Sequence, residues 1–153
     1  MLNLLKKIHL FKSFPDRDLE KIRTICKGEY FKAGEVIFKE GDRGDKFYMI
    51  LKGEVRISKF LKNIGEEALT ILKPGEYFGE MALIDNYPRS AHAIAHKNAS
   101  LVTISKSELD EIFHADRELG FKFLLIFSRT LSKRLRDMND RLITFLSAAG
   151  GGL

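Results

Sequence analysis

The chain has 153 residues, of which 44% are hydrophobic and 31% are charged, and its formal net charge is +5. This is the composition of an ordinary globular protein, and the length allows one compact domain with one or two appended helices. The single cysteine, Cys26, excludes an internal disulfide, and a lone thiol fits a reducing compartment. The apolar run 123–127 is too short to span a membrane, and Lys6 and Lys7 interrupt the N-terminal apolar residues. We therefore expect a cytoplasmic protein without a membrane segment or signal peptide.

The excess of positive charge does not by itself indicate nucleic-acid binding. The basic residues are scattered along the chain, and neither a helix-turn-helix pattern nor zinc-ligand spacing is visible. His92 and His96 are four residues apart, but they fall in a segment that is expected to be a strand, where they would not share a face. The sequence therefore predicts no direct nucleic-acid contact and no metal site.

The first segment, residues 1–27, has a helical pattern. Leu19, Ile22, Ile25 and Cys26 recur at helical spacing, and Pro15 suits the first turn of a helix. We expect helix here, ahead of the first strand.

Residues 28–104 form a series of short β-type runs that are separated by turns. The runs are Y-F-K, V-I-F-K, K-F-Y-M-I-L, E-V-R-I-S-K-F, A-L-T-I-L and S-L-V-T-I. The turns carry glycines at positions where a positive φ is expected, namely 34, 41, 44, 53, 65 and 75. Short strands at this spacing are typical of a small antiparallel barrel or jelly roll. The fold class expected is thus α+β, with an antiparallel β jelly-roll barrel between N-terminal and C-terminal helices.

The last segment, 105–146, returns to helix, and residues 147–153 are expected to be a flexible tail. Ser105 and Glu108 have the spacing of a capping box, which opens a short helix. A longer helix is expected over 117–146. Its apolar residues alternate by four and three positions: Leu131, Leu135, Met138, Leu142 and Phe145. This spacing favours a coiled-coil seam and a homodimer, although one helix face could equally pack on the chain's own barrel.

The segment 78–91, F-G-E-M-A-L-I-D-N-Y-P-R-S-A, combines features of an anion site. A helical turn that begins at Gly79 leaves backbone N–H groups unpaired, and glycine allows an anion to approach them closely. The guanidinium of Arg89 offers a planar fork of donors that matches two phosphate oxygens. Glu80 would repel an anion, so its presence indicates a ligand that also carries hydroxyl donors. A ribonucleotide has both groups, and the short reach between the residues favours a cyclic one.

This segment resembles the phosphate-binding cassette of the cyclic nucleotide-binding domain family. The catabolite activator protein, the regulatory subunits of cyclic-AMP-dependent kinase and cyclic-nucleotide-gated channels share that domain. The resemblance covers nearly the whole chain: F-K-A-G-E-V-I-F-K-E-G-D-R-G-D-K-F-Y-M-I-L-K-G-E-V looks like the family's early strands and P-G-E-Y-F-G-E-M-A-L leads into the cassette. L-S-K-R-L-R-D-M-N-D-R-L looks like the long helix behind the pocket. The resemblance implies one cyclic nucleotide-binding domain over 1–153, built as a double-stranded β-helix.

The resemblance also implies roles for individual residues. Glu80 would bind the ribose 2′-OH, and Arg89 would pair with the cyclic phosphate. Backbone amides of Gly79, Met81 and Ala82 would cap that phosphate.

Other positions would complete the pocket by the same resemblance. Ser90, followed by Ala91, would add a phosphate or base contact. The apolar wall would come from Val55, Leu69 and Leu72. The base would meet the long helix near Met138 and Asn139, where the Asn139 amide could bond a purine edge.

The expected function is therefore that of a stand-alone cyclic nucleotide sensor, which reports ligand through its C-terminal helix to an effector protein or to its own dimer. The expected ligand is cyclic AMP or cyclic GMP, with a cyclic dinucleotide as an alternative, and no cofactor is expected. A second reading is the ligand-binding half of a transcription regulator without its DNA-binding part. A hydrolytic enzyme is disfavoured because no metal ligands, active nucleophile or general-base pair are visible.

Overall fold

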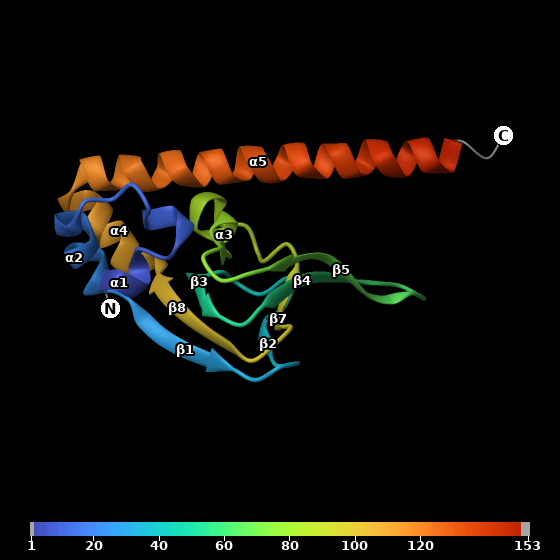
Figure 1. Cartoon of the computed structure of the whole chain (residues 1–153), viewed down its shortest axis with the longest axis horizontal. Coiled ribbons are helices and arrows are strands. Elements are labelled where there is room, and N and C mark those ends of the chain that lie inside the picture. Colours follow the sequence, from blue (N-terminus) through green and yellow to red (C-terminus); the bar gives the residue numbers. More distant parts are fainter. Residues whose placement is uncertain (1, 151–153) are drawn as a thin grey trace.

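A computed structural model describes residues 2–150, and it shows a β-sandwich with α1, α2 and α4 at one end and α5 along its length (Figure 1). The helices are α1 Leu2–Leu5, the 3-10 turn η1 His9–Phe11, α2 Asp16–Arg23, α3 Met81–Asp85, α4 Lys106–Ala115 and α5 Arg117–Gly150. The strands are β1 Lys27–Phe31, β2 Val36–Phe38, β3 Lys46–Lys52, β4 Val55–Leu61, β5 Gly65–Leu72, β6 Tyr77–Phe78, β7 His92–Ala95 and β8 Ala99–Ser105. The expected order of helix, strands and helix is confirmed.

The strands form two antiparallel sheets of four, in the orders β1-β8-β3-β6 and β2-β7-β4-β5. Among the described residues the two sheets remain separate, so the jelly roll is a sandwich and not a closed barrel. The two-residue strand β6 was not predicted, because its Tyr77–Phe78 pair is too short to show a periodic pattern. It nevertheless leads directly into the 78–91 segment.

Two apolar clusters hold the domain together. The larger one lies between the helices and the first sheet, where the side chains of Phe11, Phe47, Phe123 and Phe127 are fully buried. The smaller one fills the inside of the sandwich around Tyr48, Ile50, Val55, Leu72 and Phe78. The 78–91 segment begins where these two clusters meet, because Tyr77 belongs to the first and Phe78 to the second.

The capping box that was predicted at the start of α4 is present. The Glu108 backbone N–H donates to Ser105 Oγ at 3.3 Å, and the Ser105 hydroxyl donates to the Glu108 carboxylate at 2.5 Å. The first bond satisfies a backbone N–H at the helix N-terminus, and the second joins the two side chains of the box.

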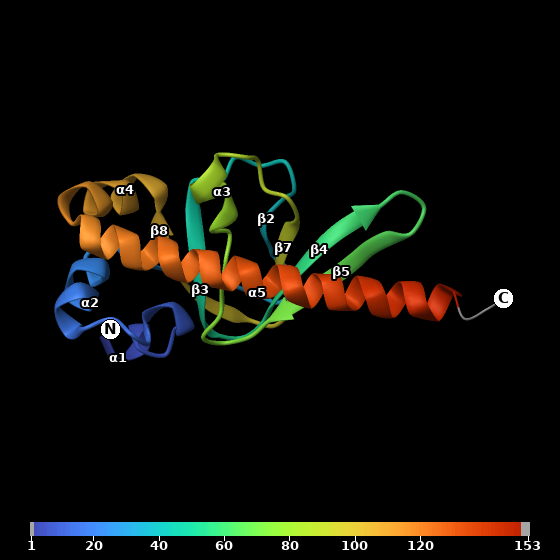
Figure 2. The same ribbon diagram turned by 90° about the horizontal axis from the view of Figure 1, so that it is seen from above.

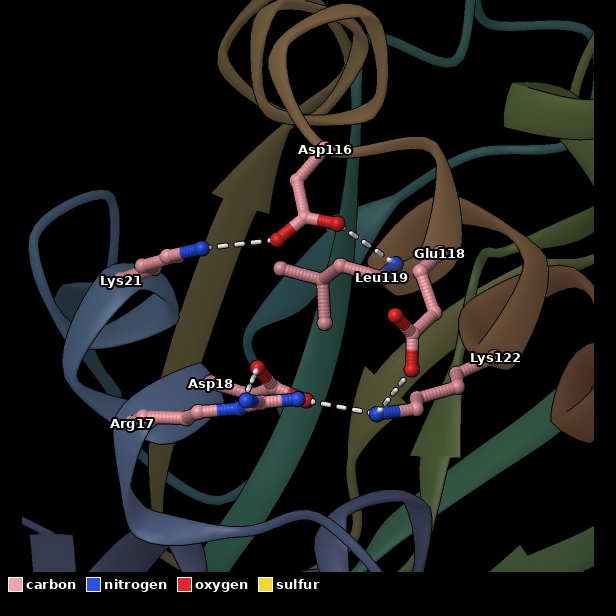
Figure 3. A network of polar contacts seen from close by, with 7 residues as sticks. All are labelled: Arg17, Asp18, Lys21, Asp116, Glu118, Leu119 and Lys122. Atoms are coloured by element: carbon pink, nitrogen blue, oxygen red, sulfur yellow. Dashed lines mark hydrogen bonds and ion pairs between the residues drawn. The ribbon is translucent and has the colours of Figure 1, made fainter.

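A network of charged side chains ties α2 to the beginning of α5 (Figure 3). The buried Asp18 carboxylate accepts a hydrogen bond from Lys122 Nζ at 2.9 Å, and Lys21 Nζ lies 2.7 Å from Asp116. The other oxygen of Asp116 accepts from the Leu119 N–H at 3.0 Å. The hydrogen bond to Asp18 raises the pKa of Lys122. The N-terminal end of α5 is thus fixed by ion pairs as well as by apolar packing.

Helix α5 runs along the long axis of the molecule, above the sandwich in Figure 1 and across it in Figure 2. Its first half buries Leu119, Phe123 and Phe127. Of the five seam residues, Leu131 is half-buried, whereas Leu135, Met138, Leu142 and Phe145 are exposed and do not pack on the chain's own sandwich. The helix also continues to Gly150, where a flexible tail was expected from residue 147, because Ala148 and Ala149 are strong helix formers. Residues 151–153 lie outside the described residues.

Over the range 2–150, no helix is long and apolar enough to cross a membrane.

Candidate functional site

The 78–91 segment folds as the strand β6, a turn at Gly79, the short helix α3 and a loop that ends in β7. Gly79 has φ +82, a conformation that side-chain-bearing residues rarely adopt. A Cβ at Gly79 would also lie 2.7 Å from Arg89 Nη1. Glycine is therefore required here both for the backbone conformation and for the approach of the guanidinium.

The Arg89 guanidinium is buried within the segment, and the residue is only 5% exposed. Its Nη1 donates to the Gly79 carbonyl at 2.7 Å and its Nη2 donates to the Lys46 carbonyl at 2.5 Å. The charge also lies 4.2 Å from the centre of the Phe38 ring. Burial lowers the pKa of Arg89, and the neighbouring Tyr48, Asp45, Glu80 and Asp42 oppose that effect. These contacts hold the guanidinium in one position.

The turn E-G-D-R-G-D, between β2 and β3, encloses the same guanidinium. The Gly41 N–H donates to the Arg89 carbonyl at 2.8 Å, and the Arg89 N–H donates to the Asp42 carbonyl at 2.8 Å. Gly44 does not have the positive φ that was predicted for it. Its role is close packing, because a Cβ there would lie 2.2 Å from that of Ala82 in α3.

Glu80 stands immediately before α3, and the residue is fully buried. Its Oε1 accepts a hydrogen bond from Arg134 Nη1 at 2.6 Å, while Arg134 Nη2 donates to the Tyr77 carbonyl at 2.5 Å. Burial raises the pKa of the Glu80 carboxyl, and the charge of Arg134 opposes this rise. The carboxylate of the cassette is therefore joined directly to α5.

Two atoms in this region have no hydrogen-bond partner. Of the buried side-chain nitrogen and oxygen atoms in residues 2–150, only Glu80 Oε2 and Arg89 Nε are unpaired. One is an acceptor and the other a donor. Buried polar atoms are rarely left unpaired in proteins, and exceptions concentrate at functional sites. The pair fits a ligand that carries both a hydroxyl donor and an anionic oxygen.

A cavity of about 490 Å³ opens beside α3, within the size range of small-molecule sites. Four of the predicted site residues line it: Met81, Ala82, Arg89 and Ser90. The other lining residues are Glu40, Gly41, Lys59, Asp85, Tyr87 and Pro88. Lys59 Nζ forms an ion pair with Glu40 at 2.7 Å on the cavity wall.

The remaining predicted residues do not line this cavity, and Gly79 and Glu80, just before α3, are among them. Val55 and Leu72 are buried partners in the β4–β5 register, inside the sandwich, and Ala91 is buried immediately before β7. Leu69 is 41% exposed on β5. Asn139 is exposed on α5. The cavity therefore gathers four of the residues expected around the phosphate, whereas Glu80, expected for the ribose, is buried in the adjoining turn, and the residues expected for the base lie elsewhere.

Sequence reasoning missed several residues that shape the site. Arg134 was noted only as a charged residue beside the seam, and Phe38, Lys46 and Gly44 were read as strand or turn residues. Only the glycine-rich turn carried a local signal, since two glycines in six residues indicate close backbone approach.

No group of metal-ligating side chains that could hold an ion is present in the range 2–150.

Comparison with known proteins agrees with this geometry. The family model for the cyclic nucleotide-binding domain matches residues 28–116, which include both sheets and the whole 78–91 segment. The chain belongs to the cyclic nucleotide-binding domain family.

Two of the curated relatives are a protein kinase regulatory subunit and a protein kinase. The chain is 37% identical over 105 residues to the cAMP-dependent protein kinase regulatory subunit of Eremothecium gossypii, covering 69% of this chain and 22% of the relative. It is 36% identical over 133 residues to cGMP-dependent protein kinase 2 of Mus musculus, covering 86% of this chain and 17% of the relative. The cyclic nucleotide-binding chain thus spans about a fifth of the length of these relatives.

A solved structure matches the fold closely. It is a cyclic nucleotide-binding domain from Methylobacillus flagellatus, with 29% identity and a TM-score of 0.82, over 93% of this chain and 80% of that one. The long helix α5 therefore belongs largely to the matched region, since the alignment leaves out only a small part of the chain.

Proposed function

We propose that this domain binds a cyclic mononucleotide and reports its occupancy through α5 to an effector protein or to a second copy of the chain. The observation that carries the proposal is the pair of unpaired buried atoms, Glu80 Oε2 and Arg89 Nε. They belong to the two residues to which the family resemblance assigns the ribose and the phosphate.

The phosphate would lie in the cavity beside α3. There Arg89 contributes a fixed positive charge, and Met81 and Ala82 contribute backbone N–H groups in the first turn of α3. Ser90 lines the same cavity and offers a hydroxyl to a phosphate oxygen or to the base. A charged donor and several backbone donors around one small space suit an anion that has several oxygen atoms.

The ribose would lie toward Glu80. Its 2′-OH would donate to Oε2, the oxygen that Arg134 leaves free. A hydrogen bond to a charged group contributes about 1.5–3 kcal/mol, which is enough to separate ribose-bearing ligands from 2′-deoxy analogues.

The choice of base is open between cyclic AMP and cyclic GMP, since the two curated relatives are named for one each. Guanine is one of the two candidate bases because the Ser90 hydroxyl can accept a hydrogen bond from its exocyclic amine. A cyclic dinucleotide remains the alternative ligand.

Isothermal titration calorimetry with a panel of cyclic mononucleotides, cyclic dinucleotides and 2′-deoxy cyclic AMP tests the proposal. We expect a ribose-bearing cyclic mononucleotide to bind most tightly and to be recovered unchanged after incubation. The linear monophosphate of the same nucleoside serves as the matched control and should bind more weakly. If no cyclic nucleotide gives a binding signal at millimolar concentration, the proposal is wrong.

A further inference from the structure

The cavity beside α3 is lined by two groups of residues. Four lining residues were expected around the phosphate, and the other six have no role in the proposed function. The charged or aromatic side chains among these six are Glu40, Lys59, Asp85 and Tyr87. Asn139, which was expected to bond the base, does not line the cavity. Apart from the Ser90 hydroxyl, the polar side chains that the cavity offers to a base therefore belong to this second group.

The charges of this second group suit a neutral base better than a second phosphate. Lys59 Nζ lies 2.7 Å from Glu40 Oε1, so a carboxylate already neutralises this cation. Asp85 adds a second carboxylate, and its Oδ1 accepts the Tyr87 N–H at 3.0 Å. One cation and two carboxylates repel an anion. The Tyr87 ring, which is 72% exposed, offers a face on which a base can stack.

Backbone hydrogen bonds hold the Glu40–Lys59 pair in place beside Arg89. Glu40 opens the turn between β2 and β3, and its neighbour Gly41 donates its N–H to the Arg89 carbonyl at 2.8 Å. The Arg89 N–H in turn donates to the Asp42 carbonyl at 2.8 Å. Lys59 lies in β4, which pairs with β5 on one side and with β7 on the other. The backbones of the pair are thus fixed relative to the cation that is expected to bind the phosphate.

The ion pair has hydrogen-bonding capacity that the chain itself does not use. An ammonium has three N–H donors, and in the range 2–150 the only hydrogen bond of Lys59 Nζ goes to Glu40 Oε1. Glu40 Oε2 makes no hydrogen bond to the described residues. The two side chains are 41% and 38% exposed, so a ligand in the cavity can reach both. The pair therefore offers a cationic donor next to a carboxylate acceptor.

A donor beside a carboxylate matches guanine better than adenine. Along one edge guanine carries the O6 acceptor, the N1–H donor and the N2–H donor, and a carboxylate can accept from two parallel N–H groups at once. Guanine can thus form three hydrogen bonds with an ammonium and a carboxylate. Adenine offers one donor and one acceptor on the same edge, so it can form only two.

We propose that Glu40 and Lys59 are specificity-determining residues that recognise guanine, so that cyclic GMP is the preferred ligand. The proposal rests on the proposed function, because it places a base beside a phosphate bound at Arg89. Glu40 accepts from N1–H and N2–H of the base. Lys59 donates to O6 and keeps its contact with Glu40, which holds the carboxylate in place.

Calorimetry with cyclic GMP, cyclic IMP and cyclic AMP tests the proposal. Cyclic IMP keeps O6 and N1–H of guanine but lacks the 2-amino group. The variants are Glu40→Gln and Lys59→Met, which remove one charge each and keep the size of the side chain. Glu54→Gln is the matched control, because Glu54 forms a similar ion pair with Lys97, at 2.6 Å, and does not line the cavity. Circular dichroism establishes that each variant is folded.

We expect the wild type to bind cyclic GMP roughly tenfold more tightly than cyclic AMP, with cyclic IMP between them, since one hydrogen bond to a charged group separates the two bases. Glu40→Gln should remove or reverse this preference, because a carboxamide offers one acceptor and one donor, as the adenine edge requires. Lys59→Met should weaken cyclic GMP and cyclic IMP by the same factor, because both lose the bond to O6. Glu54→Gln should keep the wild-type preference.

Two results would overturn the proposal while the proposed function stands. One is a wild type that binds cyclic AMP as tightly as cyclic GMP, or more tightly. The other is a preference for cyclic GMP that Glu40→Gln leaves unchanged. Tighter binding of cyclic di-GMP than of cyclic GMP would overturn both the proposal and the assignment of a mononucleotide. If the wild type binds no cyclic nucleotide, the proposed function fails and the proposal fails with it.

Discussion

At the scale of single residues, the site depends on two buried charges of opposite sign, each held by groups from elsewhere in the chain. Arg89 is bound by two backbone carbonyls and stacks on Phe38, and Glu80 is bound by Arg134. Each charge keeps one unpaired atom. Such preorganisation lowers the entropy cost of ordering side chains when a ligand binds.

Arg89→Lys tests whether the shape of the cation matters as well as its charge. An ammonium cannot reproduce the planar fork, and it cannot hold both carbonyls while facing a phosphate. We expect the affinity for the nucleotide to fall by about 1.5–3 kcal/mol, as for the loss of a charge-assisted hydrogen bond. Calorimetry measures this, with Arg136→Lys on the exposed face of α5 as the control. Unchanged affinity in Arg89→Lys would contradict the assignment of the phosphate to this residue.

Glu80→Gln tests the raised pKa of the buried carboxyl through stability. Burial raises the folded-state pKa above the usual 4.5, while the unfolded chain keeps a value near 4.5. Between the two values the folded protein holds a proton that the unfolded chain lacks, so the free energy of unfolding falls as pH rises through this window. Glutamine does not titrate, so this fall should be absent from the variant.

Urea unfolding at a series of pH values above 4.5 measures that difference. The carboxylates of Glu108 and Asp116 do not interfere, because their pKa values are lowered and they titrate below this window. Wild-type and Glu80→Gln curves that run parallel across the window would show that Glu80 is not perturbed in the folded state.

At the scale of elements, α5 carries an apolar stripe that nothing in the described chain covers. Leu135, Met138, Leu142 and Phe145 are 61%, 60%, 54% and 68% exposed. Their alternation by three and four residues is complementary to a second helix of the same pattern, as in a coiled coil. A symmetric dimer uses the same surface on both copies, so the stripe fits a second copy of this chain.

Leu142→Glu tests this homodimer. A charge in the centre of an apolar seam has to be desolvated on pairing, so the variant should shift from dimer to monomer in sedimentation equilibrium. Ile143→Glu is the matched control, because Ile143 is equally exposed but lies beside the stripe on the helix surface. The dimer proposal fails if the wild type is monomeric at about 100 μM, well above the Kd of a stable pair, or if both variants behave alike.

At the scale of the whole molecule, α5 is packed through apolar side chains in its first half and through fewer, mainly polar contacts in its second half, which is the part that the proposed function couples to ligand. The sandwich and the first half of α5 share buried apolar clusters and the α2–α5 ion pairs. The second half of α5 is held by polar side chains, one of which touches the candidate site. Local stability should therefore differ between the two parts.

Hydrogen exchange with and without nucleotide tests this division. We expect ligand to change protection in 78–91 and in α5 from Arg117 onward, with the larger change after Phe127, while the strands change little. Coupling through Arg134 and Glu80 is the physical reason. If protection changed only in 78–91 and not across α5, the domain would bind ligand passively and would not report it through this helix.

What the sequence by itself determined is local. The order of strands and turns and the cap at Ser105 could be predicted, because each depends on spacing within about a dozen residues. The same local spacing pointed to Gly79, Glu80 and Arg89, whose ligand contacts stay predictions. The strand β6 was missed because two residues carry no period, and the helical end at 147–150 was missed because Ala148 and Ala149 were read with the glycines that follow them.

Only the tertiary structure decided which groups meet at the site. Arg89 contacts the carbonyl of Lys46, 43 residues away, and Glu80 contacts Arg134, 54 residues away. No periodicity or motif records such pairs, since they depend on how α5 crosses the sandwich. The sequence showed an apolar stripe on that helix, but its orientation follows from the packing of Phe123 and Phe127. With this packing, the side of α5 that carries Arg134 faces Glu80. Leu135 and Leu142 lie on a part of the helix surface that faces away from the sandwich, so they stay exposed.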